Sequence, residues 1–341
     1  MRRSVLCGVF IMAAGFVVEA ADRPEGRMDA TRSVVHARHG MVAAAHPVAA
    51  QIGVEILKRG GSAVDAAIAT NAALAFMEPT SCGLGGDLFA MVWDPAEEKL
   101  AGLNASGRAP ARLTADKVPA AADGTIPDYT PYTWTIPGCV DGWFELHGRY
   151  GRLPMAEVLA PAIAAARNGV PVPQVIAGAW ARSVPYYEDL PGFSEVFMPG
   201  GAAPREGEVF TNAALADTLQ LVANEGRDAF YTGTIAHTLV SYSTQHGGFI
   251  SLDDLSNHTS DWVEPISTTY RGVTVWELPP NGQGLAALQM LNILETFDLS
   301  SLGRANPEFW HVMIEAKKLA YADRARYYAD PAFATVPVDA L

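Results

Sequence analysis

The chain has 341 residues, of which 49% are hydrophobic and 18% are charged, a composition typical of a globular protein that can bury a large core. Its formal net charge of −13 at pH 7 argues against nucleic acid as a partner. The length fits one large domain or two ordinary ones.

The first 21 residues have the pattern of a secretory signal peptide. Arg2 and Arg3 form a basic start, an apolar run extends from Val5 to Val18, and the following alanines offer a cleavage site. A periplasmic or secreted location is therefore predicted. A membrane anchor is the alternative, although the apolar run is shorter than the roughly 20 residues that a spanning helix needs. Removal of residues 1–21 would lower the net charge to −14 and leave no apolar run long enough to hold the protein in a membrane.

A helix is the first strong structural signal after this segment. Ser62 and Asp65 form an approximate capping box, and the alanine-rich run Ala63–Ala75 has high helix propensity. Small side chains of this kind allow a helix to lie close to a sheet. Pro79 ends the helix, because proline disfavours helical backbone angles at the residue before it.

A glycine-rich loop follows the helix. Gly83, Gly85 and Gly86 lie within four positions, which predicts positive φ angles or close backbone contacts that alanine cannot share. An ordinary turn is the alternative, since glycine is common in turns. A phosphate-binding loop is not expected, because the glycines come after a helix and neither GK[ST] nor GxGxxG is present.

Two β-hairpins are expected, separated by a mainly helical region. Leu88–Asp94 and Leu100–Asn104 form the first, with a turn at Pro95–Lys99. The second lies within Pro265–Leu278 and turns at Arg271-Gly272. Strand pairs separated by helices indicate an α+β fold.

Helical periodicity dominates much of the remaining chain, and a glycine follows several of the expected helices as a C-terminal stop. The expected helices are Val140–Tyr150, Met155–Asn168, Ala213–Glu225, Tyr231–Gln245, Gly284–Thr296 and Phe309–Tyr328. The proline-rich stretch Ala111–Gly138 is expected to be a loop that folds over a surface. Asp253 and Asp254 are interpreted as caps of a short helix rather than as a catalytic pair.

No cofactor or metal is expected. Cys82 and Cys139 lie 57 positions apart and match no zinc-site spacing, and the eight histidines form no HExxH motif. The two cysteines could pair in an oxidising compartment, but buried structural thiols are the preferred interpretation. A serine hydrolase has little support, because no GxSxG motif is present.

Several stretches, in order, resemble one protein family. They are GGSAVDAA, EPTSCGLGGDLFAMVWD, GRAP, IPGCVDGWFELHGRYGRLP at Ile136–Pro154, PPNGQGLAALQMLNILE at Pro279–Glu295 and EAKKLAYADRARYYADPAF at Glu315–Phe333. Together they resemble the large-subunit portion of the gamma-glutamyltransferases, also called gamma-glutamyltranspeptidases or glutathione hydrolases, which are N-terminal-nucleophile (Ntn) hydrolases. The likeness covers nearly everything after the first forty residues.

The resemblance implies an α+β fold that is the large-subunit half of an αββα sandwich, with residues 22–341 as an incomplete large-subunit region. Family members are zymogens that cleave themselves. A threonine then becomes the N-terminus of a small subunit and acts as nucleophile, with its own α-amino group as base. That threonine is expected beyond Leu341, and Thr335 is not a candidate. The chain is therefore expected to contain no catalytic residue and to be inactive without the small subunit from the same precursor.

The resemblance also suggests which residues bind substrate. In the family, an arginine in an R-E-x-A-P setting binds the α-carboxylate of the gamma-glutamyl group, a role that suits the forked guanidinium. Alignment of the Ala-Pro pair puts Ser106 at the arginine, Gly107 at the glutamate and Arg108 two positions later. Arg108 is predicted to bind substrate, with Ser106, Asn104 and Asp87 as further contributors. A structural salt bridge is the alternative for Arg108.

Three functions stay open at this point. The resemblance implies transfer of gamma-glutamyl groups from glutathione or a similar amide, through an acyl-enzyme, to water, an amino acid or a peptide. The segments GLGGDLF at Gly83–Phe89 and NASGRAP at Asn104–Pro110 depart from the family pattern and also resemble an acylase-like side branch. An amidohydrolase that acts on a non-glutamyl amide is therefore one alternative. A non-catalytic secreted binding protein with the same fold is the other.

Overall fold

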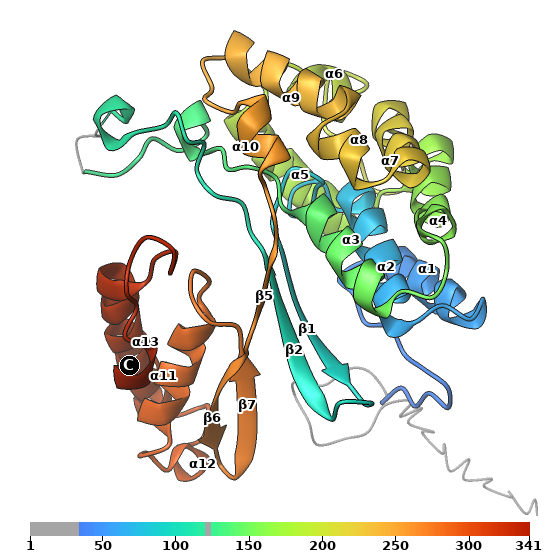
Figure 1. Cartoon of the computed structure of the whole chain (residues 1–341). Helices are drawn as coiled ribbons and strands as arrows, with labels where there is room; N and C mark the ends of the chain where they lie inside the picture. The colour runs from blue at the N-terminus through green and yellow to red at the C-terminus, as the bar shows by residue number, and fades with distance from the viewer. Residues whose placement is uncertain (1–33, 120–123) are drawn as a thin grey trace, which may run out of the picture. The chain divides into compact units, whose positions relative to one another are not determined.

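The computed structural model describes residues 34–119 and 124–341, so the expected signal peptide at residues 1–21 lies outside the described residues. The chain divides into two compact units, Met1–Met41 and Val42–Leu341. The described residues of the first unit form no helix or strand, and all elements labelled in Figure 1 belong to the second. No helix in the described part of the chain combines the length and apolar character needed to cross a membrane.

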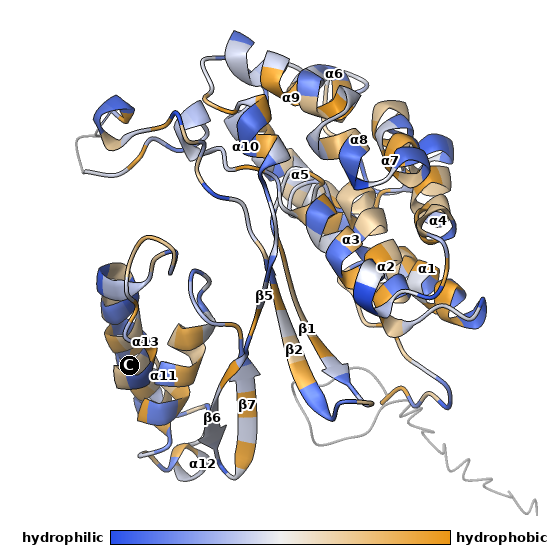
Figure 2. Cartoon of the chain, viewed as in Figure 1, coloured by the Kyte–Doolittle hydropathy of each residue, from blue (hydrophilic) through white to orange (hydrophobic). Residues whose placement is uncertain are grey.

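The predicted alanine-rich helix is present as α2 (Ala63–Met77). Its capping box is confirmed, because Ser62 Oγ accepts a hydrogen bond from Asp65 N at 3.0 Å and Asp65 Oδ2 accepts one from Ser62 N at 2.8 Å. Eleven of its fifteen residues are buried, and apolar residues run along it in Figure 2. Its main partners are α1 (Pro47–Lys58), α3 (Cys139–Tyr150) and α4 (Met155–Asn168). The small side chains of α2 therefore pack mainly among helices.

A three-stranded antiparallel sheet carries the candidate site. Its strands, in spatial order, are β1 (Leu88–Asp94), β2 (Lys99–Ala105) and β5 (Asp261–Val263). The first two form the predicted hairpin, and α3 packs on them. Asn104 in β2 pairs with Phe89 on one side and with Asp261 on the other. The sequence does not predict β5, because three residues are too few to show alternation.

The second predicted hairpin consists of β6 (Ile266–Tyr270) and β7 (Val273–Glu277). Arg271 and Gly272 form its two-residue turn with φ angles of 52° and 77°. Two successive positive φ values are typical of the type I′ turn, which matches the twist of the flanking strands.

Two of the predicted helices, present as α11 (Gly284–Leu294) and α13 (Pro307–Tyr327), follow this hairpin. α11 packs on both strands of the hairpin, and α13 packs on α11. Leu294, Val312 and Ala316 form a small apolar core of their own.

The region between the hairpins is helical, as predicted, with one correction. α4 and α7 (Ala213–Glu225) end at glycines with positive φ, as expected for this kind of stop. The predicted helix Tyr231–Gln245 is present as α9 (Thr234–Gln245), which begins later than expected, and a separate short helix, α8 (Arg227–Tyr231), precedes it. The chain turns tightly at Gly233, where a Cβ atom would lie 3.0 Å from Ala229.

Asp254 caps a short helix, α10 (Leu252–Ser256), as interpreted from the sequence. Its Oδ2 accepts a hydrogen bond from Ser251 N at 2.9 Å, and its Oδ1 accepts one from Ala111 N at 3.0 Å. The remaining elements are α5 (Gln174–Tyr187), α6 (Phe193–Phe197), α12 (Leu299–Leu302), the strand pair β3 (Val170–Pro171) and β4 (Val209–Phe210), and 3₁₀ turns at Ala115–Lys117, Pro131–Thr133 and Val338–Ala340. The strand pair of β3 and β4, the 14-residue helix α5 and the remaining short helices are not predicted from the sequence.

Candidate active site

A cavity of about 200 Å³ lies where β2 ends and β5 begins. It brings together residues from four separate segments of the chain. They are Asn104, Ser106, Gly107, Arg108, Asp261, Val263, Pro280, Asn281, Asp330, Pro331 and Ala332. Three of the predicted substrate-binding residues, Asn104, Ser106 and Arg108, are among them.

Asn104, Ser106 and Asn281 form a closed cycle of hydrogen bonds on one wall of the cavity. Ser106 Oγ donates to Asn104 Oδ1 at 2.7 Å, Asn104 Nδ2 donates to Asn281 Oδ1 at 2.8 Å, and Asn281 Nδ2 donates to Ser106 Oγ at 2.9 Å. Ser106 N also donates to Asn104 Oδ1, at 3.0 Å. Each side chain both donates and accepts, so every amide orientation in the cycle is fixed by its neighbours.

Asn281 is a further residue of the candidate site, and the sequence does not single it out. It follows two prolines in the PPNGQG stretch, which was noted only for its resemblance to the family. An asparagine between prolines and a glycine is a common turn residue, and this hides any other role. Only the fold shows that Asn281 meets Asn104 and Ser106.

Arg108 lies between two carboxylates. Its Nε donates to Asp330 Oδ2 at 3.1 Å, and its Nη2 lies 3.5 Å from Asp261 Oδ2. The Arg108 side chain is 44% exposed, compared with 57% for Asp261 and 30% for Asp330. These two salt bridges agree with the alternative interpretation of Arg108 as a structural residue. At this wall, one positive charge faces two negative charges.

Asp87 lies behind the wall of the cavity. Its Oδ1 accepts a hydrogen bond from Gly107 N at 2.9 Å. Gly107 itself is pressed against the chain at Ile136, whose N–H donates to Arg108 O at 3.0 Å. Asp87 therefore supports the backbone that carries Ser106 and Arg108.

The prediction that the glycine-rich loop has positive φ angles or close backbone contacts is wrong. Gly83, Gly85 and Gly86 are not among the glycines with positive φ, and a Cβ atom at any of them would come no closer than 3.5 Å to another group. The loop acts through a carbonyl instead, since Gly86 O accepts hydrogen bonds from Gly138 N at 3.1 Å and Cys139 N at 2.9 Å, which caps α3. The tight contact is at Gly138, where a Cβ atom would lie 2.1 Å from Ala105 O.

The two cysteines of the described chain are free thiols. Cys139 is buried in the first turn of α3, where its Sγ contacts Asn71 Oδ1 at 3.4 Å, and burial raises the pKa of its thiol to about 12. Such a thiol is a poor nucleophile at neutral pH. Across residues 34–119 and 124–341, no three His, Cys, Asp or Glu side chains gather as a metal site would require.

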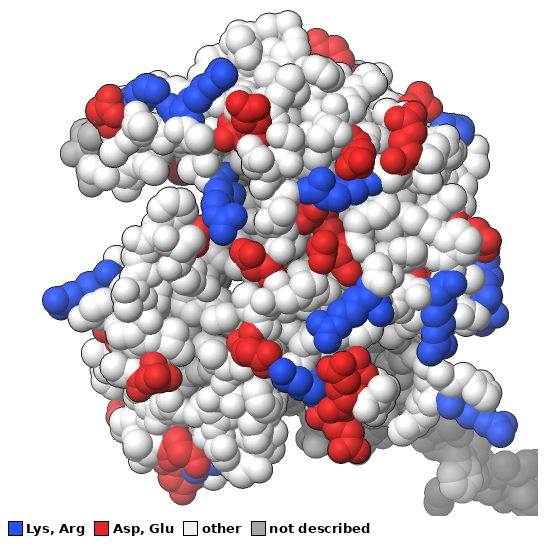
Figure 3. Space-filling view, viewed as in Figure 1, with Lys and Arg blue, Asp and Glu red and all other residues white. Residues whose placement is uncertain are grey.

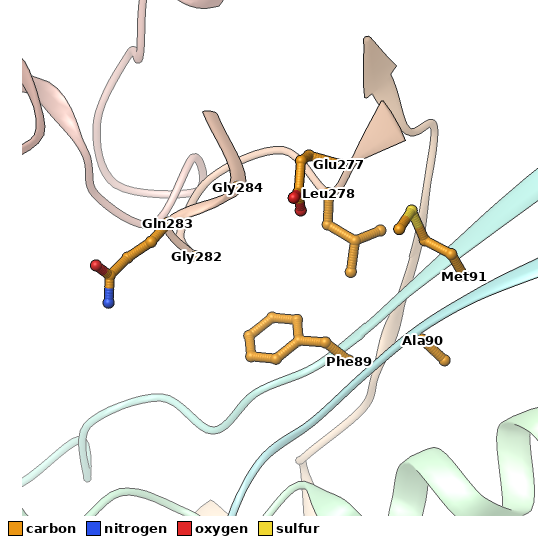
Figure 4. A pocket seen from close by; sticks show the side chains of 8 residues that line it. All are labelled: Phe89, Ala90, Met91, Glu277, Leu278, Gly282, Gln283 and Gly284. Atoms are coloured by element: carbon orange, nitrogen blue, oxygen red, sulfur yellow. The ribbon is translucent and has the colours of Figure 1, made fainter. Parts of the chain in front are cut away.

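A second pocket, of about 260 Å³, lies beside the first. It is lined by Phe89, Ala90, Met91, Glu277, Leu278, Gly282, Gln283 and Gly284. Figure 4 shows Leu278 and Met91 facing one another above Phe89, so the walls are largely apolar. On the face of the molecule seen in Figure 3, acidic and basic side chains are interspersed, and this face offers no extended basic patch. The cavity at Arg108 is the better candidate for chemistry because its polar groups converge.

Comparison with known proteins identifies the family and several of its relatives. The gamma-glutamyltranspeptidase family model matches residues 49–341. The glutathione hydrolase-like YwrD proenzyme of Bacillus subtilis (strain 168) is 38% identical over 302 residues, which are 88% of this chain and 57% of that protein. The chain thus spans less than two-thirds of the length of this relative.

Among the solved structures that match this chain are an acylase and a gamma-glutamyltranspeptidase. Cephalosporin acylase from Bacillus halodurans is 42% identical with a TM-score of 0.84, over 93% of this chain and 60% of that one. Helicobacter pylori gamma-glutamyltranspeptidase is 30% identical with a TM-score of 0.83, over 90% of this chain and 89% of that one. The α+β structure has the N-terminal-nucleophile hydrolase fold that the resemblance implied. The chain belongs to the gamma-glutamyltranspeptidase family.

Proposed function

We propose that residues 22–341 are the large-subunit region of a self-processing enzyme that cleaves or transfers gamma-glutamyl groups from amides such as glutathione. Family membership supports an amide hydrolase or acyltransferase. The proposed nucleophile is a threonine beyond Leu341, which autoproteolysis of the zymogen would expose at the N-terminus of a small subunit. The pattern of residues 1–21 supports export to the periplasm or the exterior.

The charged groups around Arg108 are the reason for proposing a gamma-glutamyl donor. A gamma-glutamyl head group bears a carboxylate and an ammonium on one carbon, and the wall of the cavity offers a cation beside an exposed carboxylate, Asp261. The 3.5 Å distance from Arg108 Nη2 to Asp261 Oδ2 is longer than the usual 2.7–3.2 Å for such a bond. A donor carboxylate can therefore bind the guanidinium at Nη2 while the donor ammonium pairs with Asp261.

In the proposed reaction, the threonine oxygen bonds to the carbonyl carbon of the donor and its proton passes to the α-amino base. The C–N bond of the amide then breaks, and the leaving amine takes that proton. Water, or the amino group of an acceptor amino acid or peptide, then attacks the carbonyl carbon of the acyl ester. The ester C–O bond to the threonine breaks, and a proton from the attacking group passes to the released threonine oxygen. The part of this chain is to hold the donor head group in one place before the attack. Without the small subunit, we expect the chain to be inactive.

A neutral acyl amide is the second candidate donor, and the same wall provides the reason. Two carboxylates already offset the charge of Arg108, so a donor that brings only a further carboxylate meets a net negative surface. Ser106 also stands where the resembled family has its arginine. The likeness to a cephalosporin acylase supports this candidate.

The test compares three p-nitroanilides on the processed, full-length precursor: gamma-glutamyl, glutaryl and butyryl. The glutaryl amide lacks the ammonium, and the butyryl amide lacks both charges. We expect wild type to prefer the gamma-glutamyl donor, and Arg108→Ala to lower kcat/KM for it about 10- to 100-fold, the range for losing one charged hydrogen bond. Arg108→Lys should restore part of the loss, since lysine keeps the charge but not the fork.

Arg167→Ala is the matched control. Arg167 makes one surface ion pair, with Asp217 at 2.8 Å, and its side chain is about as exposed as that of Arg108. Equal losses on all three donors would show that Arg108 has only a structural role. Preference of wild type for the butyryl amide would favour the acylase function, and no turnover of any donor would favour the binding protein.

A further inference from the structure

Asp141 is a buried carboxylate that the proposed reaction does not use. It lies in the first turn of α3, within the stretch Ile136–Pro154, and is 2% exposed. Its Oδ1 accepts a hydrogen bond from Arg227 Nε, and its Oδ2 accepts from both Ser260 N, at 2.7 Å, and Ser260 Oγ. The buried carboxylate is held in one geometry by these hydrogen bonds, and loss of Arg227 would leave its charge uncompensated.

The pair holds the segment that leads into β5. Ser260 immediately precedes Asp261, and Arg227 Nη2 donates to His258 O. Asp261 in turn pairs with Asn104 in the sheet, and its Oδ2 faces Arg108 Nη2. The carboxylate of Asp141 thus holds Ser260, the residue directly before Asp261, which is the acid that we assign to the donor ammonium.

The same turn of α3 also holds the opposite side of the cavity wall. The backbone N–H groups at the start of α3 donate to Gly86 O. Asp87, which follows Gly86 in the sequence, accepts a hydrogen bond from Gly107 N. Tyr231 fixes the turn itself, because its hydroxyl donates to Pro137 O at 2.8 Å and accepts from Asp141 N at 3.0 Å. Gly107 and Asp261, the two neighbours of Arg108 in the cavity wall, are therefore both linked to the N-terminal end of α3.

We infer that Asp141, together with Arg227, is a positioning residue that fixes Asp261 beside Arg108 and so sets the preference for donors whose head group carries an ammonium. This inference rests on the proposed function. Asp141 touches neither the donor nor the reacting atoms. Its effect reaches the donor through Ser260 and the start of β5.

Asp65 offers a matched control for loss of a buried carboxylate. Its side chain is fully buried, and its Oδ2 accepts hydrogen bonds from the backbone N–H groups of Ser62, Arg152 and Leu153 at 2.8–3.1 Å. None of these partners belongs to β5 or to the cavity wall. Asp65→Asn should lower stability as Asp141→Asn does, without moving Asp261.

The experiment measures kcat/KM for gamma-glutamyl and glutaryl p-nitroanilide, the thermal midpoint Tm, and amide hydrogen exchange, on the processed full-length precursor. Asp141→Asn should lower the gamma-glutamyl to glutaryl ratio about tenfold, mainly through KM, as expected for a misplaced charge-assisted contact. Ser260→Ala, which keeps the backbone N–H bond, should give a smaller change in the same direction. Asp65→Asn should lower Tm and leave the ratio unchanged.

An equal fall for both donors in Asp141→Asn and Asp65→Asn would overturn the inference in favour of a purely structural role. If Asp141→Asn does not process itself, Ser260→Ala decides, and an unchanged ratio in that variant counts against positioning. Hydrogen exchange tests the link between Asp141 and the start of β5 independently of enzyme activity. Faster exchange at residues 258–263 is expected in Asp141→Asn but not in Asp65→Asn, and unchanged exchange there would overturn the link even if wild type preferred another donor.

Discussion

A Cβ atom at Gly107 would lie 1.5 Å from the carbonyl oxygen of Ile136. No side chain fits there, although the resembled family has a glutamate at the aligned position. The backbone of residues 107 and 108 lies tightly against the loop segment at Ile136, where Ile136 N donates a hydrogen bond to Arg108 O at 3.0 Å. This close contact fixes the backbone path by which Arg108 reaches the cavity.

Gly107→Ala is expected to be strongly destabilising. The obstacle is a backbone carbonyl, which cannot rotate away as a side chain can, so the two segments must separate at a cost of about 1–3 kcal/mol or more. The measurement is the free energy of unfolding of the precursor, together with the extent of self-cleavage. Gly85→Ala is the control, because a Cβ atom there meets nothing within 4 Å and should leave both quantities near those of wild type. Equal effects of the two variants would contradict the prediction.

Asn281→Ala should weaken turnover without unfolding the protein. It removes two bonds of the cycle with Asn104 and Ser106, each with a net value of about 0.5–1.5 kcal/mol. We expect kcat/KM to fall about tenfold for every donor, since the wall rather than a charge is disturbed. Asn292→Ala is the control, because Asn292 accepts a hydrogen bond from Thr268 on the second hairpin and does not line the cavity. Wild-type kinetics in Asn281→Ala would show that the cycle has no part in binding.

His258 should make the protein less stable below neutral pH. It is 5% exposed, its Nε2 has no hydrogen-bond partner, and burial lowers the pKa of its imidazole below 6.5, although nearby Asp141 opposes the shift. A lowered folded pKa means that the unfolded chain binds a proton first as pH falls. Stability is therefore full above about pH 6.5 and falls below it, by at most about 1.4 kcal/mol per pH unit from one group.

The measurement for His258 is denaturant unfolding between pH 5 and 8. His258→Asn should show a shallower fall than wild type over the acidic part of this range. His46 is also buried, and burial likewise lowers its pKa, so it contributes a remaining slope in the variant. A pH profile identical to wild type would mean that the pKa of His258 does not differ between the folded and the unfolded chain.

The two thiols should react at different rates in the folded protein. Cys139 is 4% exposed and burial raises its pKa to about 12, whereas Cys82 is partly exposed and its pKa is raised less. Because the thiolate is the reactive form, iodoacetamide at pH 8 should label Cys82 well before Cys139. Peptide mapping by mass spectrometry gives both rates. If neither thiol reacts until a reductant is added, the two cysteines form a disulfide in the folded protein.

The sequence by itself determined the elements that depend on neighbouring residues. The capping box at Ser62 and Asp65 set the start of α2, and the mostly apolar run from Leu88 to Asp94, followed by a turn, predicted β1. Glycines at 169 and 226 ended α4 and α7 because positive φ there costs little without a Cβ atom. The ordered motifs also identified the family, since each is read along the chain and needs no knowledge of contacts.

Only the tertiary structure decided which distant segments meet. It paired Asp261 with Asn104, placed Asn281 between Asn104 and Ser106, and put Arg108 between Asp261 and Asp330. It also showed that the restricted glycines near the cavity are Gly107, held against Ile136, and Gly138, held against Ala105, rather than those of the predicted loop. Close backbone contacts, strand pairs and ion pairs form between segments that packing brings together, and a local pattern of residues contains no information about its partner across the fold.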